Sequence, residues 1–215
     1  MQSLVEKYWR HRFAVLFVTL VSTVVAKPLL EPISTPRVID LLLAVNLVIL
    51  MVGFGGRRFL YVALLALVFV TLHEVRELLG ENTVISLATL VWVLGCLAGL
   101  AATVNHVLRP GIVDHERIFA ALDVYVLAGL IFGVSYYALN RVSPGSFDST
   151  EALPFNEFRA IYFSFVTLAT LGYGDVVPKS EAACTLAVVE AVSGQMYLAV
   201  MLARLVSLYG RGEEV

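Results

Sequence analysis

Charged residues are scarce in this sequence, and neither sign predominates. Of its 215 residues, 15% are charged, with 15 lysines and arginines against 17 aspartates and glutamates. Soluble domains are about one-quarter charged, so the low content argues against a soluble protein. The lack of a basic excess argues against a nucleic-acid partner. Apolar side chains are abundant instead, at 59% of the total, and this composition predicts a membrane protein surrounded by the lipid bilayer.

Residues for metal or catalytic chemistry are also few. Cys96 and Cys184 are the two cysteines, and both lie in apolar runs, which favours buried, reduced thiols over a disulfide or a metal site. Cysteines and histidines do not cluster, so we expect no zinc and no cofactor. A membrane enzyme or an assembly protein is the alternative of a different class, but its polar candidates are scattered over different runs, and we do not expect an enzyme. These candidates are Asp40, Asn46, Asp123 and Glu190.

Long apolar runs recur along the chain. A helix needs about 20 apolar residues to cross a bilayer, with a range of ~17–25. Six runs approach this length, separated by proline and glycine: 13–30, 38–54, 58–78, 83–107, 118–140 and 182–208. The first resembles a signal peptide, but the five later runs favour an uncleaved span. The sequence therefore predicts an all-α, multi-pass membrane protein with six transmembrane helices.

The basic residues predict the orientation of these spans, because cytosolic loops carry an excess of lysine and arginine. With both termini in the cytosol, nine basic residues lie inside and six outside. Those inside are Lys7, Arg10, Arg12, Arg57, Arg58, Arg109, Arg117, Arg204 and Arg211, and those outside are Lys27, Arg37, Arg76, Arg141, Arg159 and Lys179. We therefore expect a protein of the cell membrane with both termini cytosolic.

The segment between the last two runs has a different character. Residues 141–156 are polar and rich in turn residues, whereas residues 157–169, EFRAIYFSFVTLA, are apolar but too short to cross. A stretch of ~10–14 apolar residues is more typical of a re-entrant segment than of a span. Asn156 is a suitable N-cap for a helix over 157–169, and Glu157 is favourable in its first turn.

A polar motif, TLGYGD, follows this short helix at residues 170–175. At membrane depth, irregular backbone persists only where protein or a water-filled cavity satisfies its polar groups. Gly172 and Gly174 can adopt a positive φ, which other residues avoid at a cost of about 1–2 kcal/mol each. Backbone that alternates between left- and right-handed conformations turns successive carbonyls to one side. A row of carbonyls presents its negative ends to a cation.

The motif and its surroundings resemble the pore of potassium channels. The family pattern is TVGYGD after a short pore helix, and this chain departs from it by Leu171 in place of valine. The wider resemblance runs from about Ala120 to Tyr209. It implies an outer helix 118–140, a turret 141–156, a pore helix 157–169, a filter 170–175 and an inner helix 182–208.

The resemblance also implies how an ion is held. Moving a small ion from water into a medium of low dielectric costs on the order of 20 kcal/mol before compensation. In this family, backbone carbonyls replace the lost water oxygens. The chain has a single GYG and supplies one wall of such a cage, so a homotetramer with potassium as permeant ion is implied, and a non-selective monovalent cation channel of the same architecture is the alternative. The filter residues are Thr170, Leu171, Gly172, Tyr173 and Gly174.

Five other residues are expected to support the filter. Relatives often have a tryptophan where this chain has Phe163, which cannot donate a hydrogen bond to Asp175. We expect Asp175 to find a partner in Tyr162 or water, and the outer end of the filter to be less firmly held. Thr167 lies on the pore helix behind the filter. Glu190 is expected to hydrogen-bond the back of the pore helix, an interpretation that we favour over a proton sensor.

The last run supplies the candidates for gating. Gly194 occupies a position where related inner helices often have a hinge glycine, and close packing against the pore helix is the alternative. Four more residues would face the cavity or the cytosolic constriction in the same register: Gln195, Leu198, Leu202 and Val206. Leu202 and Val206 either form an apolar ring that gates by dewetting or pack the crossing of the inner helices.

Residues 1–108 are expected to form a four-helix peripheral domain, and residues 109–215 the pore domain. In voltage-gated relatives the fourth helix has an arginine at every third position. The run here, TVISLATLVWVLGCLAGLAATVNHVL, has neither lysine nor arginine. One elementary charge is worth ~2.3 kcal/mol per 100 mV, so the sequence predicts little voltage dependence. The final YGRGEEV is too short to fold as a sensor domain.

Overall fold

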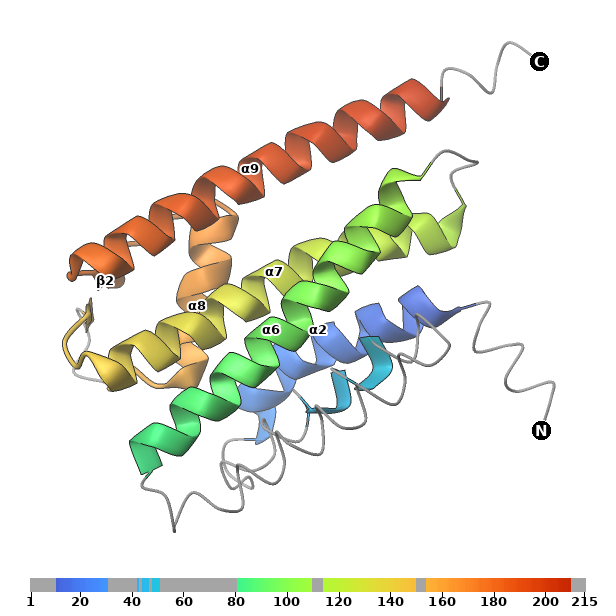
Figure 1. The fold of residues 1–215 in the computed structure, drawn as a ribbon. Helices are drawn as coiled ribbons and strands as arrows, with labels where there is room; N and C mark the ends of the chain where they lie inside the picture. The colour runs from blue at the N-terminus through green and yellow to red at the C-terminus, as the bar shows by residue number, and fades with distance from the viewer. Residues whose placement is uncertain are drawn as a thin grey trace. The chain divides into compact units, whose positions relative to one another are not determined.

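The computed structural model describes residues 11–30, 42, 44–46, 48–50, 81–109, 114–149 and 154–209. These residues form helices α2 (Arg12–Leu30), α6 (Glu81–Leu108), α7 (His115–Val142), α8 (Glu157–Leu168) and α9 (Glu181–Tyr209), and strands β1 (Phe147–Ser149) and β2 (Val176–Pro178) (Figure 1). The chain divides into two compact units, Met1–Leu127 and Ala128–Val215. The boundary between these units lies within α7; the division into a peripheral and a pore domain after residue 108 stays a prediction.

Three helices of the described part of the chain are long and apolar enough to cross a membrane. They are Leu90–Leu108, His115–Val142 and Glu181–Arg204. These helices correspond to the fourth, fifth and sixth predicted spans. Within the first predicted span, residues Arg12–Val25 form a shorter apolar helix. Of the second predicted span, 38–54, the structure describes residues 42, 44–46 and 48–50, which are helical, and the third predicted span, 58–78, lies outside the described residues.

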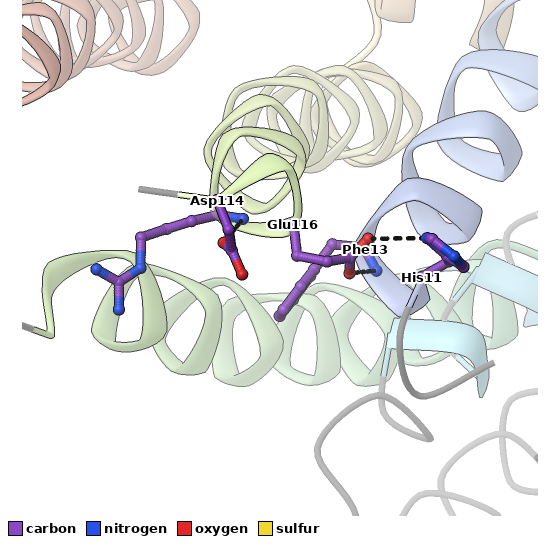
Figure 2. A network of polar contacts seen from close by, with 5 residues as sticks. His11, Phe13, Asp114 and Glu116 are labelled. Atoms are coloured by element: carbon purple, nitrogen blue, oxygen red, sulfur yellow. Dashed lines mark hydrogen bonds and ion pairs between the residues drawn. The ribbon is translucent and has the colours of Figure 1, made fainter. Parts of the chain in front are cut away.

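In the first unit, polar contacts join the starts of α2 and α7 (Figure 2). Asp114 precedes α7, and its Oδ1 accepts a hydrogen bond from the Arg117 N–H at 2.9 Å, as an N-cap does. Glu116 in the first turn of α7 accepts the Phe13 N–H through Oε2 at 3.1 Å. Its Oε1 lies 3.9 Å from His11 Nδ1. A carboxylate at this place accepts a hydrogen bond from an N–H in the first turn of α2 and interacts favourably with the positive end of that helix.

The cysteines differ in their surroundings. Cys96 on α6 is buried and free, as expected, but Cys184 on α9 is exposed and free. The expectation of a buried thiol was therefore wrong for Cys184. The reason is its position on α9, because the neighbouring Ala183 occupies the side of the first turns that packs inward and Cys184 points away from the core of its unit.

An aromatic cluster forms the core of the second unit. Tyr136 of α7, Phe147 of β1 and Phe163 of α8 pack with ring centroids 5.1 to 5.5 Å apart in edge-to-face arrangements, the geometry that aromatic pairs prefer. Ala160, Val176 and Ala183 complete the buried cluster. It therefore joins all five elements of this unit.

The two strands pair in a small antiparallel sheet. Phe147 lies opposite Pro178, and Ser149 opposite Val176. Beyond the strands, the Lys179 N–H donates to the Ser146 carbonyl at 2.8 Å. The polar, turn-rich sequence of residues 141–156 predicted a turret and gave no sign of this pairing. Strands of three residues are too short to show an alternating pattern in the sequence.

Candidate functional site

The short helix α8 begins and ends close to where the sequence places it. Asn156 caps it, because its side chain accepts a hydrogen bond from the Arg159 N–H at 3.0 Å, and Glu157 lies in the first turn. The predicted N-cap is therefore confirmed. The helix ends at Leu168, with Ala169 as its C-cap. Figure 1 shows α8 between α7 and α9.

The backbone after α8 alternates in handedness. Thr170 and Gly172 both have φ 57°, and Gly174 has φ 77°. Among the described residues, Thr170 is the one non-glycine with positive φ, so Leu171 and Tyr173 between these positions have negative φ. The alternation expected from the two glycines is present, and it begins two residues before Gly172, at Thr170. The positive φ of Thr170 was not expected from the sequence, because a β-branched residue rarely adopts this conformation.

The first residues of this loop are held by α8. The Thr170 N–H donates to the Thr167 carbonyl at 3.0 Å, and the Leu171 N–H to the Val166 carbonyl at 2.9 Å. After the loop the chain enters β2 through Val176, which is 4% exposed within the aromatic cluster. The loop is therefore anchored at both ends within one chain.

Between these anchors the described part of the chain leaves the loop uncovered. Leu171 is 55% exposed and Tyr173 65% exposed. A Cβ placed on Gly172 or Gly174 would meet nothing within 4 Å. The loop thus presents a surface that a bound ion, water or another chain would complete.

The residues expected to support the filter occupy different places around the loop. Phe163 is buried in the aromatic cluster, on which Val176 also packs. Tyr162, Thr167 and Asp175 are half-buried. A partner of Asp175 stays a prediction. Phe163 thus shares a buried cluster with Val176, which follows the loop 170–175, an arrangement that was not expected from the sequence.

A buried polar network lies behind the pore helix. Glu190 of α9 is 0% exposed. The Tyr136 hydroxyl donates to its Oε2 at 2.6 Å, and the Ser164 hydroxyl of α8 is hydrogen-bonded to its Oε1. The expected hydrogen bond between Glu190 and the pore helix is therefore present. The roles of Tyr136 and Ser164 were not predicted from the sequence. Hydroxyl groups are common in apolar helices, and a single sequence does not show which helix each of them will face.

Glycines let the three helices of this unit approach closely. A Cβ on Gly133 of α7 would lie 2.7 Å from the Ile161 Cα, and one on Gly194 of α9 would lie 2.6 Å from Leu168 Cδ1. Helix α9 is continuous through Gly194. These contacts favour the packing interpretation of Gly194, and a hinge at this position stays a prediction.

The other gating candidates lie on the same helix. Gln195, Leu198 and Leu202 are exposed within this chain. The side chain of Val206 lies outside the described residues. Their assignment to a cavity or a constriction stays a prediction.

Substitution of Gly194 by alanine provides a test of the packing contact. We expect the added methyl group to displace the side chain of Leu168, the last residue of α8, which lies two residues before Thr170. Overpacking of this kind typically costs about 1–3 kcal/mol. The variant should unfold at a lower temperature than the native protein in the same detergent. An unchanged unfolding temperature together with a lower open probability would instead favour the hinge.

Comparisons with known proteins cover the C-terminal part of the chain. Residues 124–211, less than half of the chain, match a family model described as ion channel. This match, together with the relatives described in the next paragraph, indicates a channel rather than an enzyme. With the apolar helices, they also support a multi-pass membrane protein. No solved structure matches the chain.

Three curated relatives carry the names of potassium channels. The chain is 35% identical over 99 residues to two pore potassium channel c of Oryza sativa subsp. japonica, covering 46% of this chain and 20% of the relative. It is 38% identical over 84 residues to two-pore potassium channel 4 of Arabidopsis thaliana, covering 39% and 28%. It is 33% identical over 81 residues to the inward rectifier potassium channel Kirbac3.1 of Paramagnetospirillum magnetotacticum, covering 36% and 24%. The chain therefore spans between a fifth and little more than a quarter of these relatives.

Proposed function

We propose that this chain is one subunit of a homotetrameric, potassium-selective channel of the cell membrane. The observation that carries the proposal is the alternating backbone of Thr170, Gly172 and Gly174 in an exposed loop at the end of a short helix. Alternating hands direct successive peptide carbonyls to one side. The relatives named as potassium channels support the same ion.

In this proposal the permeant ion is held by peptide oxygens. The carbonyls of Thr170, Leu171, Gly172 and Tyr173, with the Thr170 hydroxyl, replace part of the hydration shell, as in potassium filters. Gly174 continues the alternation at the outer end. One chain provides one wall, so four copies surround the ion.

The exposed apolar side chains of α9 fit an arrangement of this kind. Val188, Val192, Met196 and Leu202 are each more than half exposed within the chain. Apolar surface of this extent requires lipid or other protein around it. We propose that α9 lines the pore beside other copies, with Gln195 and Leu198 toward the cavity, Leu202 and Val206 at a cytosolic constriction, and both termini in the cytosol.

The proposed function is tested by ion flux through the purified protein in lipid vesicles. A potassium gradient should drive uptake, and replacement of potassium by sodium should nearly abolish it. In planar bilayers with mixed potassium and sodium, the reversal potential should follow the potassium gradient. A reversal potential near zero in opposed potassium and sodium solutions would select the non-selective alternative, and a monomer in detergent without flux would contradict the channel.

We further expect little voltage dependence. The described helix α6, which corresponds to the fourth span, contains no lysine or arginine along Glu81–Leu108. A charge that crosses the full field contributes ~2.3 kcal/mol per 100 mV, and this helix has no lysine or arginine that could supply such a gating charge. Open probability measured between negative and positive voltages should change only slightly. A conductance–voltage slope equivalent to several charges would contradict this expectation.

A further inference from the structure

The buried network of Gly129, Tyr136, Ser164 and Glu190 contains more contacts than its hydroxyl hydrogens can supply. Tyr136 Oη contacts Glu190 Oε2 at 2.6 Å. Ser164 Oγ contacts Glu190 Oε1 and also the Gly129 carbonyl oxygen, at 2.7 Å. A hydroxyl carries one hydrogen, and a carboxylate or a carbonyl carries none. Three contacts therefore share two hydroxyl hydrogens.

A third hydrogen resolves this shortage only if the carboxyl group supplies it. The Tyr136 hydroxyl has its one hydrogen directed at Oε2. If the Ser164 hydroxyl donates to the Gly129 carbonyl, its oxygen is free to accept from an O–H on Glu190 Oε1. If Glu190 were a carboxylate, one of the two contacts of Ser164 would join two oxygens with no hydrogen between them. Such a contact between buried oxygens is unfavourable.

The surroundings of Glu190 also favour the uncharged form. The residue is fully buried on a helix of membrane-spanning length. Within the described part of the chain its carboxyl oxygens contact two hydroxyl groups, and no ion pair to it is present. An isolated carboxylate taken out of water costs far more than a neutral acid with hydrogen-bond partners.

We infer that Glu190 is a neutral carboxylic acid that donates its hydrogen to Ser164, which in turn donates to the Gly129 carbonyl. The chain of hydrogen bonds runs from α9 through the pore helix to the backbone of α7. Tyr136 adds a second bond from α7. Glu190 is thus a positioning residue: it holds the pore helix, which carries the proposed filter, against both long helices. This inference deepens the proposed function by naming what fixes the helix behind the filter.

Infrared difference spectroscopy tests the protonation state without relying on ion flux. The wild-type spectrum at neutral pH minus that of Glu190→Gln should show the C=O stretching band of a protonated carboxyl group, shifted in heavy water. Glu181→Gln, the same substitution at an exposed first-turn residue of the same helix, should show only the loss of an ionised carboxylate. A carboxylate difference for Glu190→Gln as well would overturn the inference.

The hydroxyl partners provide a second spectroscopic test that keeps Glu190 in place. In Ser164→Ala the acid loses its acceptor, so the protonated carboxyl band should move. Tyr136→Phe keeps the aromatic ring and removes the donor to Oε2, so it should move the same band. If neither variant changes the band, Glu190 does not take part in this chain of hydrogen bonds. These two variants therefore test the role of Glu190 even if Glu190→Gln does not fold.

Flux through lipid vesicles tests the positioning role. Glutamine keeps an N–H donor for Ser164 and a carbonyl acceptor for Tyr136, so Glu190→Gln should conduct within about twofold of the native protein, whereas Glu190→Ala should lose about tenfold. Equal losses in both variants would contradict a neutral donor at this position. If the native protein conducts nothing, the proposed function fails, and the spectroscopic tests still decide the state of Glu190.

Discussion

Alanine in place of Gly172 is expected to reduce potassium flux by at least about tenfold. The residue has φ 57°, where a residue with a Cβ is less stable by about 1–2 kcal/mol. In the proposed homotetramer this strain would occur four times. Since each 1.36 kcal/mol added to a barrier slows passage tenfold, relaxation of the backbone away from its alternating form should impair conduction well before the protein fails to fold. Flux of potassium into vesicles is the measurement.

Gly145 offers a matched control for this experiment. It also has a positive φ, 83°, and a Cβ there would likewise meet nothing within 4 Å. It lies in the turn after α7, outside the filter. Gly145→Ala should therefore cost similar stability and leave flux and selectivity unchanged. If both variants conducted as the native protein does, Gly172 would not belong to the ion path.

The second large effect is expected from alanine in place of Gly133. Its Cβ would lie 2.7 Å from the Ile161 Cα and 3.2 Å from the Ile161 N. Both atoms are backbone, so the whole of α8 has to move away from α7. We expect a loss of about 1–3 kcal/mol from overpacking. In a chain of this size, this corresponds to a fall in unfolding temperature of roughly 2–4 °C per kcal/mol, measured in detergent.

Gly129, one turn earlier on α7, is the comparison. Its Cβ would meet the far ring atoms of Phe165 at 2.7 Å, and a ring can turn where backbone cannot. Gly129→Ala should therefore destabilise the protein less than Gly133→Ala. The reverse order would show that α8 is not fixed against α7 at Ile161.

The sequence predicted most of what local rules determine. The limits of α8, its Asn156 cap and the three long helices follow from apolar run length and capping preference, which act over a few neighbouring residues. The glycines of TLGYGD predicted left-handed backbone at residues 172 and 174 for the same reason. The residues that determine each of these features lie within it or directly beside it in the sequence.

Features that depend on distant partners were not predictable. The φ of Thr170 is positive although its side chain disfavours that conformation. We attribute this conformation to the hydrogen bonds that the N–H groups of Thr170 and Leu171 donate to α8. The partners of Glu190 lie 26 and 54 residues away along the chain. The pairing of β1 with β2 joins segments on either side of the pore helix and filter. A single sequence does not say which of many hydroxyls or short extended segments will meet.

The β1–β2 pairing has a consequence for the proposed assembly. It joins Ser149 to Val176, so α8 and the loop after it lie within one closed segment of chain. The entropy cost of closing a loop grows only slowly with its length, and here the strand pairing meets that cost inside a single polypeptide. In the proposed homotetramer, a newly made subunit would therefore order residues 170–175 before it encounters another copy, and association would need only to align surfaces that already exist.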